Sequence, residues 1–306
     1  MTSLLTNASA ITALQNLSAT NRAMQQTQDR ISTGMRVANA SDNAAYWSIA
    51  TTMRSDNSAL SSVKDALGMG SATVDVASAA LKTTSDLVTQ IKSKLVAASQ
   101  PGIDRAKVQS EISQLQNQIK SVADSSNFSG QNWLSVDTTD GDYTATKNIV
   151  ASFTRTGSAV AIGTIDVDTS KISLYDSGAQ TGIIDKDRTA GSTTVAVGDL
   201  DISALTDSTA DQTTLKDYVS VVDAALTDIT TAASDLGAVK TRINTQTDFL
   251  GNLMDAVTKG VGQLVDADMN QESTRLQALQ VQQQLGVQSL SIANQSSQQI
   301  LSLFRG

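Results

Sequence analysis

The feature that most constrains this 306-residue chain is a long alternation of three- and four-residue spacings between apolar residues. Such spacing brings side chains to one side of an α-helix and forms the seam of a coiled coil. The seam positions are Leu60, Val63, Leu67, Gly70, Val74, Ala77, Leu81, Thr84, Val88, Ile91 and Leu95, of which nine are apolar. A helix is therefore predicted here, and it should end before the helix-breaking pair Pro101-Gly102.

Two further segments repeat the pattern. Residues 108–122 keep the spacing after a short turn, so this second helix should pack antiparallel against the first. In the other half of the chain the spacing runs from Leu215 to Leu264 and is interrupted only by Lys240 and Thr247. A helix of that length spans about 70 Å. Gly260 and Gly262 each cost about 1 kcal/mol inside a helix, so we expect it to end near them.

Residues 128–210 differ, because Gly, Thr, Ser and Asp are frequent and apolar residues alternate over short runs. Alternation of this kind predicts β-strands. The runs contain Val160 and Ile162, Ile165 and Val167, Ile172 and Leu174, and Val195 and Val197. The predicted fold is mainly α with a small β-rich insertion. Its two helical arms must meet to cover their seams, which gives a long coiled-coil rod and an elongated, hairpin-like subunit.

Composition argues against an enzyme. The chain has no Cys and no His, so Ser-His-Asp and Cys-His nucleophiles and Cys/His zinc sites are excluded. Asp266 and Asp268 lie in a linker between helices without neighbouring aromatic residues, and we assign them no catalytic role. Asp137, Asp140 and Asp142 do not match the spacing of a calcium loop and are interpreted as a solvated turn. We expect no cofactor and no metal.

The charge pattern also limits the partners. The net charge is −8, and no basic tract interleaved with aromatic residues indicates nucleic-acid binding. No run of 18 apolar residues predicts membrane insertion. The N-terminus has neither the basic region nor the apolar core of a general secretory signal, so a secreted chain of this kind would need another export route.

The two termini are unusual because residues 1–21 and 276–304 contain no charged side chain, yet both are amphipathic at helical spacing. Two interpretations remain open: weakly ordered tails, or helices that fold only when copies of themselves surround them. Under the second interpretation, the apolar stripes of the two terminal helices are self-assembly surfaces. The residues assigned to assembly are Leu14, Leu17, Met24, Ile31, Leu279, Leu290, Ile300, Leu303 and Phe304.

Three segments resemble bacterial flagellins. Residues 28–50, QDRISTGMRVANASDNAAYWSIA, resemble the N-terminal signature, in which Ser32, Gly34 and Arg36 match a turn and Asp42 and Asn43 match an Asp-Asp-Ala-Ala-type stretch. Residues 127–134, NFSGQNWL, resemble the motif after the second long helix, and residues 289–306 resemble the closing helix. The Tyr46-Trp47 pair and the compact size are similar to flagellins of soil alphaproteobacteria.

The resemblance implies a structural subunit that self-polymerises into the extracellular flagellar filament, the propeller for swimming. The alternative is a hook–filament junction protein. Residues 1–36 with 268–306 would form an inner two-helix domain, residues 37–56 a spoke linker, and residues 57–127 with 211–260 a helical rod. Residues 128–210 would form a β-rich hairpin and a small outer domain. Among the spoke residues, Gly34 also suits a helix C-cap, because glycine tolerates a positive φ.

The resemblance also implies partners. These are copies of the chain and other flagellins, a type III export chaperone at the C-terminal helix, and the cap and hook-junction proteins. A further implication concerns recognition by animal Toll-like receptors, which usually read an Arg-Val-Arg-Glu-Leu-like run on the rod. The equivalent positions here include Gln90, Lys92 and Ser93, and we therefore expect weak recognition.

Overall fold

A computed structural model describes residues 7–157 and 159–303, with side chains up to residue 296. The chain divides into two compact units, of which unit 1 comprises residues 1–58 and 254–306 and unit 2 comprises residues 59–253. Two long helices, α2 (Ala44–Ala98) and α4 (Thr209–Val265), contribute to both units. Among the described residues no helix combines the length and the apolar character needed to cross a membrane.

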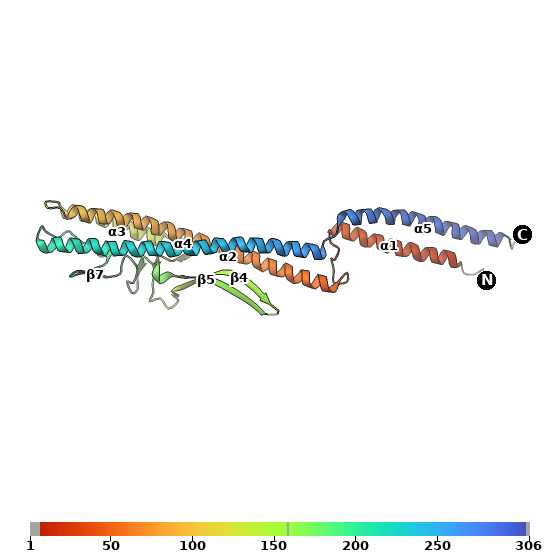
Figure 1. Cartoon of the computed structure of the whole chain (residues 1–306), viewed down its shortest axis with the longest axis horizontal. Coiled ribbons are helices and arrows are strands. Elements are labelled where there is room, and N and C mark those ends of the chain that lie inside the picture. The colour runs from red at the N-terminus through yellow and green to blue at the C-terminus, as the bar shows by residue number, and fades with distance from the viewer. Residues whose placement is uncertain (1–6, 158, 304–306) are drawn as a thin grey trace. The chain divides into compact units, whose positions relative to one another are not determined.

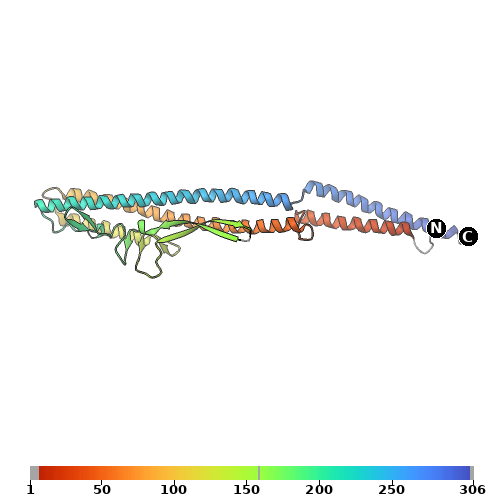
Figure 2. The same ribbon diagram turned by 60° about the horizontal axis from the view of Figure 1, so that its bottom comes forward.

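Unit 1 is built on a pair of helices, α1 (Ala8–Thr33) and α5 (Met269–Leu303), which lie side by side and antiparallel (Figures 1 and 2). Both helices have side-chain caps at their N-termini. Asn7 accepts a hydrogen bond from the backbone of Ala10, and Asp268 accepts one from the backbone of Gln271. A small apolar core completes the unit and contains Val37, Ala50, Val261 and Val265.

Unit 2 contains the long seam that the sequence predicts. All eleven seam positions from Leu60 to Leu95 are buried, including Gly70 and Thr84. After a turn, α3 (Arg105–Ser125) runs back along α2, and the Lys94 ammonium and the Glu111 carboxylate form an ion pair between the two helices (Figure 1). The mainly α fold with coiled-coil seams is thereby confirmed. The fully buried seam residues of α4 in unit 2 are Leu215, Val222, Ile229, Leu236, Ile243 and Leu250.

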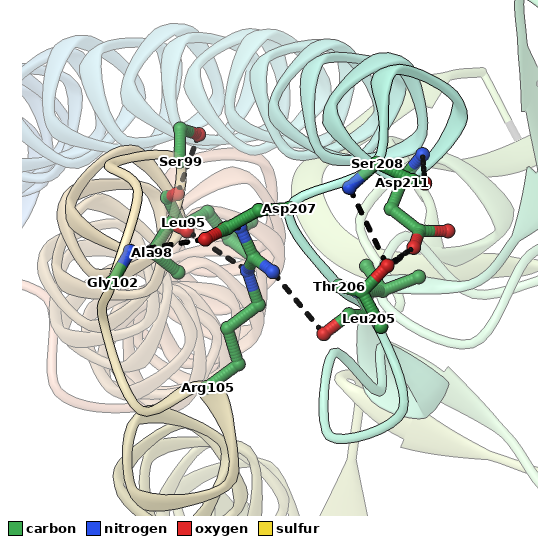
Figure 3. A network of polar contacts seen from close by, with 10 residues as sticks. All are labelled: Leu95, Ala98, Ser99, Gly102, Arg105, Leu205, Thr206, Asp207, Ser208 and Asp211. Atoms are coloured by element: carbon green, nitrogen blue, oxygen red, sulfur yellow. Dashed lines mark hydrogen bonds and ion pairs between the residues drawn. The ribbon is translucent and has the colours of Figure 1, made fainter.

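A buried arginine joins the α2–α3 turn to the loop before α4 (Figure 3). Arg105 is only 6% exposed, and its guanidinium donates to the backbone oxygens of Ala98 and Leu205. It also forms an ion pair with the Asp207 carboxylate at 2.6 Å. Asp207 in turn accepts a hydrogen bond from the Gly102 backbone. The guanidinium therefore satisfies a carbonyl at the C-terminus of α2 that the helix itself leaves unpaired.

The insertion contains four two-stranded sheets among the described residues. The longest is the antiparallel pair of β4 (Thr146–Thr156) and β5 (Ala159–Asp168). One sheet, formed by β3 and β6, is parallel, and the other two are antiparallel. The remaining elements are β1 (Asn127–Phe128), β2 (Gln131–Asn132), β3 (Ser135–Val136), η1 (Thr169–Lys171), β6 (Tyr175–Asp176), β7 (Arg188–Ala190), β8 (Thr193–Val195) and η2 (Val197–Asp199).

The structure corrects three details of the sequence-based fold. Ile172 and Leu174 do not form a strand, because the Asp168 side chain caps Ser170 and starts the 3₁₀ turn η1 directly after β5. Val197 lies in η2, so only Val195 of that pair is in a strand. Helix α4 also continues past Gly260 and Gly262 to Val265. Burial of Val261 and Val265 in the core of unit 1 offsets the cost of the two glycines.

A buried carboxylate organises the middle of the insertion. Asp176 is fully buried and accepts hydrogen bonds from the backbone and hydroxyl of Thr138 and from the hydroxyl of Thr181. Burial alone would raise the pKa of this carboxyl, but the hydrogen bonds lower it well below its usual range. Asp176 is therefore ionised and fully partnered at neutral pH, as a buried charge requires.

Gly70 interrupts the apolar seam of α2 because the β4–β5 hairpin docks there. A Cβ atom on Gly70 would lie 2.5 Å from Cγ2 of Ile149, which is buried and β-branched and cannot turn aside freely. We predict that Gly70→Ala lowers the free energy of unfolding by about 1–3 kcal/mol through overpacking.

Urea unfolding followed by circular dichroism measures the effect, and Gly68→Ala is the matched control. A Cβ on Gly68 meets nothing within 4 Å, so this substitution should raise the free energy of unfolding by about 1 kcal/mol through helix propensity. Equal stability of the two variants would contradict the account of Gly70.

Candidate assembly surface of the terminal helices

The paired helices α1 and α5 meet along an inner seam with alternating three- and four-residue spacing on each helix. The α1 side of the inner seam consists of Ala10, Ala13, Leu17, Thr20, Met24, Thr27 and Ile31, all buried or half-buried. The α5 side consists of Glu272, Leu276, Leu279, Gln283, Gly286, Leu290 and Ala293, also buried or half-buried. These side chains are buried by contacts between α1 and α5 of the same chain.

Polar contacts also join α1 and α5 along the inner seam. The Gln283 side-chain amide donates to the Asn21 side-chain oxygen at 2.9 Å. At one end of the seam, Arg30 and Glu272 form an ion pair at 3.1 Å, in which Glu272 is 7% exposed. Arg30 lies in the last turn of α1 and Glu272 in the first turn of α5, so each charge also complements the dipole of its own helix.

The opposite face of α5 carries a second apolar stripe that no other part of the described chain covers. Val281, Leu285 and Ile292 are 55%, 58% and 66% exposed. Val281, Leu285 and Ile292 each follow an inner-seam residue by two positions. Two residues turn a helix by about 200°, so these side chains point away from α1. Ile11 and Leu14 are similarly exposed on α1. We call these five residues the outer stripe.

The outer stripe lies in a part of the chain without charge. Residues 8–21 and 276–296 contain no Asp, Glu, Lys or Arg. A helix face that stays in water normally carries charged side chains, and exposed apolar stripes on helices mark association surfaces. Glutamine, serine and asparagine flank the outer stripe instead, and these can be buried at a lower cost than a charge if they find hydrogen-bond partners.

The predicted assembly residues divide between the two faces. Leu279 is buried and Leu17, Met24, Ile31 and Leu290 are half-buried in the inner seam. Leu14 lies outside the inner seam, which uses Ala13 instead, and its side chain is 58% exposed, so its assignment to assembly stays a prediction. The α5 helix includes the backbone of Ile300 and Leu303, but their side chains, like all of Phe304, lie outside the described residues.

Sequence reasoning missed Ile11, Val281, Leu285 and Ile292. The signal was present in the sequence. Ala278, Val281, Leu285, Gln288 and Ile292 repeat the three- and four-residue spacing of a seam, but in a second register. Two registers in one helix indicate two apolar faces.

The motif residues between α1 and α2 hold a compact turn. Gly34 has a φ of 69° and caps α1, which confirms its predicted role as a C-cap, and its carbonyl accepts a hydrogen bond from Ala267 at 2.9 Å. Arg36 donates from its backbone to Val265 and from its guanidinium to Leu264. Both acceptors are carbonyls of the last turn of α4, which the helix leaves unpaired.

The next motif residues start α2. The Asp42 carboxylate accepts hydrogen bonds from the backbones of Ala38 and Asn39, both at 3.0 Å. Asn43 accepts one from the backbone of Tyr46 and so caps the first turn of α2. Ser32 is exposed in the last turn of α1. The structure thus gives Gly34, Arg36, Asp42 and Asn43 local hydrogen-bonding roles in unit 1.

The three positions assigned to receptor recognition lie on α2 in unit 2. Gln90 is exposed, and the Lys92 ammonium is 2.5 Å from the Asp223 carboxylate on α4. The Ser93 hydroxyl donates to the backbone oxygen of Thr89 within its own helix.

The acidic residues that suggested other chemistry have local roles. Asp137 accepts hydrogen bonds from Thr139, and Asp140 accepts one from Asp142, as expected for a turn. Asp268 caps α5, and Asp266 pairs with Met35 in a β-bridge. Within residues 7–157 and 159–303, no group of three or more acidic side chains is placed to hold a metal ion.

The fold and the outer stripe define a class of protein: a coiled-coil subunit whose paired terminal helices carry an exposed apolar stripe. Comparisons with known proteins agree. Residues 4–139 match the bacterial flagellin N-terminal helical region, and residues 219–304 match the bacterial flagellin C-terminal helical region.

Named relatives match over the full length of both chains. Flagellin C of Rhizobium meliloti (strain 1021) is 48% identical, a flagellin of Brucella melitensis biotype 1 is 47% identical, and flagellin A of Rhizobium meliloti is 41% identical. The chain therefore belongs to the bacterial flagellins, the structural subunits that self-polymerise into the extracellular filament of the flagellum and serve motility. Its expected similarity to alphaproteobacterial flagellins is confirmed, and nothing in the comparisons supports the hook–filament junction alternative.

Proposed function

We propose that copies of this flagellin assemble through the outer stripe, so that the paired helices α1 and α5 form the inner domain of the filament. The observation that carries the proposal is the exposure of Val281, Leu285 and Ile292 on a helix face without charge. Burying a leucine or isoleucine side chain gains about 1.5–3 kcal/mol. A contact of this size becomes strong when a head-to-tail interface repeats it along an open helical lattice.

We assign the remaining parts of the chain to the other proposed domains of the subunit. Residues 1–36 with 268–306 form the inner domain, and residues 37–56 form the spoke, whose turn is fixed by Gly34, Arg36, Asp42 and Asn43. Residues 57–127 with 211–260 form the rod. Residues 128–210 carry eleven Asp against five Lys and Arg, so they account for most of the net charge of −8. A strongly acidic segment suits the solvated outer surface of a filament.

The outer stripe also suggests how the partners bind. Before assembly the apolar residues of α5 need cover, which supports an export chaperone at the C-terminal helix. Cap and hook-junction proteins at the filament ends would meet the same faces. Rhizobium meliloti relatives include proteins named flagellin A, B, C and D, and we propose that this chain can share a filament with other flagellins. The role we propose is structural, without catalysis and without a cofactor.

Leu285→Asp tests the assembly surface. The side chain is exposed in the monomer, so the substitution should leave the folded monomer unchanged. In a filament it would bury an unpaired carboxylate, which costs several kcal/mol. We predict that the variant monomer keeps its circular dichroism spectrum but does not elongate filament seeds in a kosmotropic salt, with a critical concentration raised at least about 100-fold.

Val96→Asp is the matched control for that experiment. Val96 is 53% exposed on α2 in unit 2, so it presents the same apolar-to-acidic change at similar exposure. This variant should elongate seeds at nearly the normal rate. Normal elongation by Leu285→Asp, measured by light scattering and checked by negative-stain microscopy, would refute the proposed surface.

We also predict a weak response from Toll-like-receptor reporter cells, because the run around Gln90, Lys92 and Ser93 lacks the Arg and Glu of a recognised rod helix. Gln90→Arg with Ser93→Glu should strengthen the response to the monomer. A response to the unaltered protein as strong as that to an enteric flagellin would contradict the prediction.

A further inference from the structure

An uncharged polar pair lies at the middle of the inner seam, formed by the seam residue Gln283 on α5 and by Asn21, which follows the seam residue Thr20 on α1. The Gln283 amide nitrogen donates to the Asn21 side-chain oxygen at 2.9 Å, and both side chains are half-buried. Their seam neighbours are the apolar Leu17 and Met24 and the polar Thr20 on α1, and the apolar Leu279 on α5. A leucine at either position would bury more apolar area, so an amide pair lowers the stability that this seam could have.

The other polar contacts lie at the ends of the seam. Arg30 and Glu272 pair next to the turn between α1 and α2, where backbone bonds from Arg36 to Val265 already hold the chain. At the far end, the Asn7 side chain donates to the backbone oxygen of Ala293. A backbone acceptor is present at every residue, so this contact cannot distinguish one partner sequence from another. Selectivity in the middle of the seam rests on the amide pair.

Charge acts on the pairing of these helices only near one end, through Arg30 and Glu272, because residues 8–21 and 276–296 carry none. In an assembly each α5 lies among other copies of α1 and α5 with similar apolar spacing. A polar side chain at one seam position is a known way to specify register and partner at a cost in stability. When the pairing is wrong, the amide faces an apolar side chain and loses its hydrogen bond.

We propose that Asn21 and Gln283 select the pairing of α5 with the antiparallel α1 of its own chain, against slipped registers and against exchange with neighbouring copies. This inference rests on the proposed assembly through the terminal helices. The pair acts as a specificity device and contributes little to the strength of assembly. Exchange of helices between copies is the competing state that the amides exclude.

The chain has no cysteine, so engineered disulfides can report the pairing directly. A Cβ atom on Gly286 would lie 3.8 Å from Cβ of Leu17, which is the usual separation in a disulfide. Leu17→Cys with Gly286→Cys therefore reports the native register. Leu17→Cys with Leu279→Cys reports a slip of one heptad. A mixture of chains that carry Leu17→Cys alone or Gly286→Cys alone reports exchange between copies.

Oxidation of seeded filaments, followed by non-reducing electrophoresis, gives the result. With Asn21 and Gln283 in place, only the native-register pair should crosslink, and it should do so within one chain. With Asn21→Leu and Gln283→Leu, slipped or intermolecular crosslinks should increase at least about tenfold. If this double variant does not assemble, the same crosslinks are measured in the unassembled protein. A native-only pattern in either preparation overturns the proposal.

Two variants separate selectivity from a general disturbance of the helices. Asn21→Gln with Gln283→Asn keeps an amide pair and should restore the native pattern. Gln25→Leu with Gln277→Leu makes the same chemical change at exposed positions and should also leave the pattern native. Slipped crosslinks in this control at the level of the Asn21→Leu and Gln283→Leu variant would overturn the proposal. Failure of the proposed assembly surface would appear separately, as normal elongation by Leu285→Asp.

Discussion

A helix whose two opposite faces are both apolar cannot bury both of them against a single partner helix. Helix α5 is such a helix, with the inner seam on one side and Val281, Leu285 and Ile292 on the other. Because α1 covers only one of these faces, the chain by itself leaves hydrophobic surface in water. Copies of the same chain can supply the missing cover. The terminal helices thus cover one apolar face within the chain and leave a second one exposed, as the proposed assembly requires.

Unit 2 shows the contrasting case. Its seam is covered within the chain, and charged side chains such as Lys92, Asp223, Asp75 and Lys240 pair across its outer surface. Surface ion pairs of this kind contribute little stability. Ion pairs lie on the outer surface of unit 2, and amides flank the outer stripe of the terminal helices.

The long seams were predictable because one physical rule determines them. All eleven positions that the spacing selected between Leu60 and Leu95 are buried. The same rule could not explain why Gly70 interrupts the seam, since the cause is Ile149, nearly eighty residues away in the chain. It also does not predict that Asp168 caps a 3₁₀ turn directly after β5, which places Ile172 outside a strand. Contacts of this kind depend on tertiary packing, which periodicity does not encode.

The assembly surface was only partly predictable. Absence of charge singled out the terminal segments, but on α1 the apolar stripe was assigned to one face when it divides between two. The placement of Leu14 required knowing that the small Ala13 occupies the seam. On α5 the second register was readable, and it indicates the face that copies of the chain would cover.

Cysteine labelling at position 285 tests the central claim most directly. Leu285→Cys and Val96→Cys each place one thiol on an exposed helix face of a chain without cysteine. Both should react rapidly with a maleimide in the monomer. In filaments assembled before labelling, the account predicts that Cys at 285 is protected while Cys at 96 still reacts. Equal, rapid labelling of the two positions in the filament would show that copies of the chain do not cover the outer face of α5.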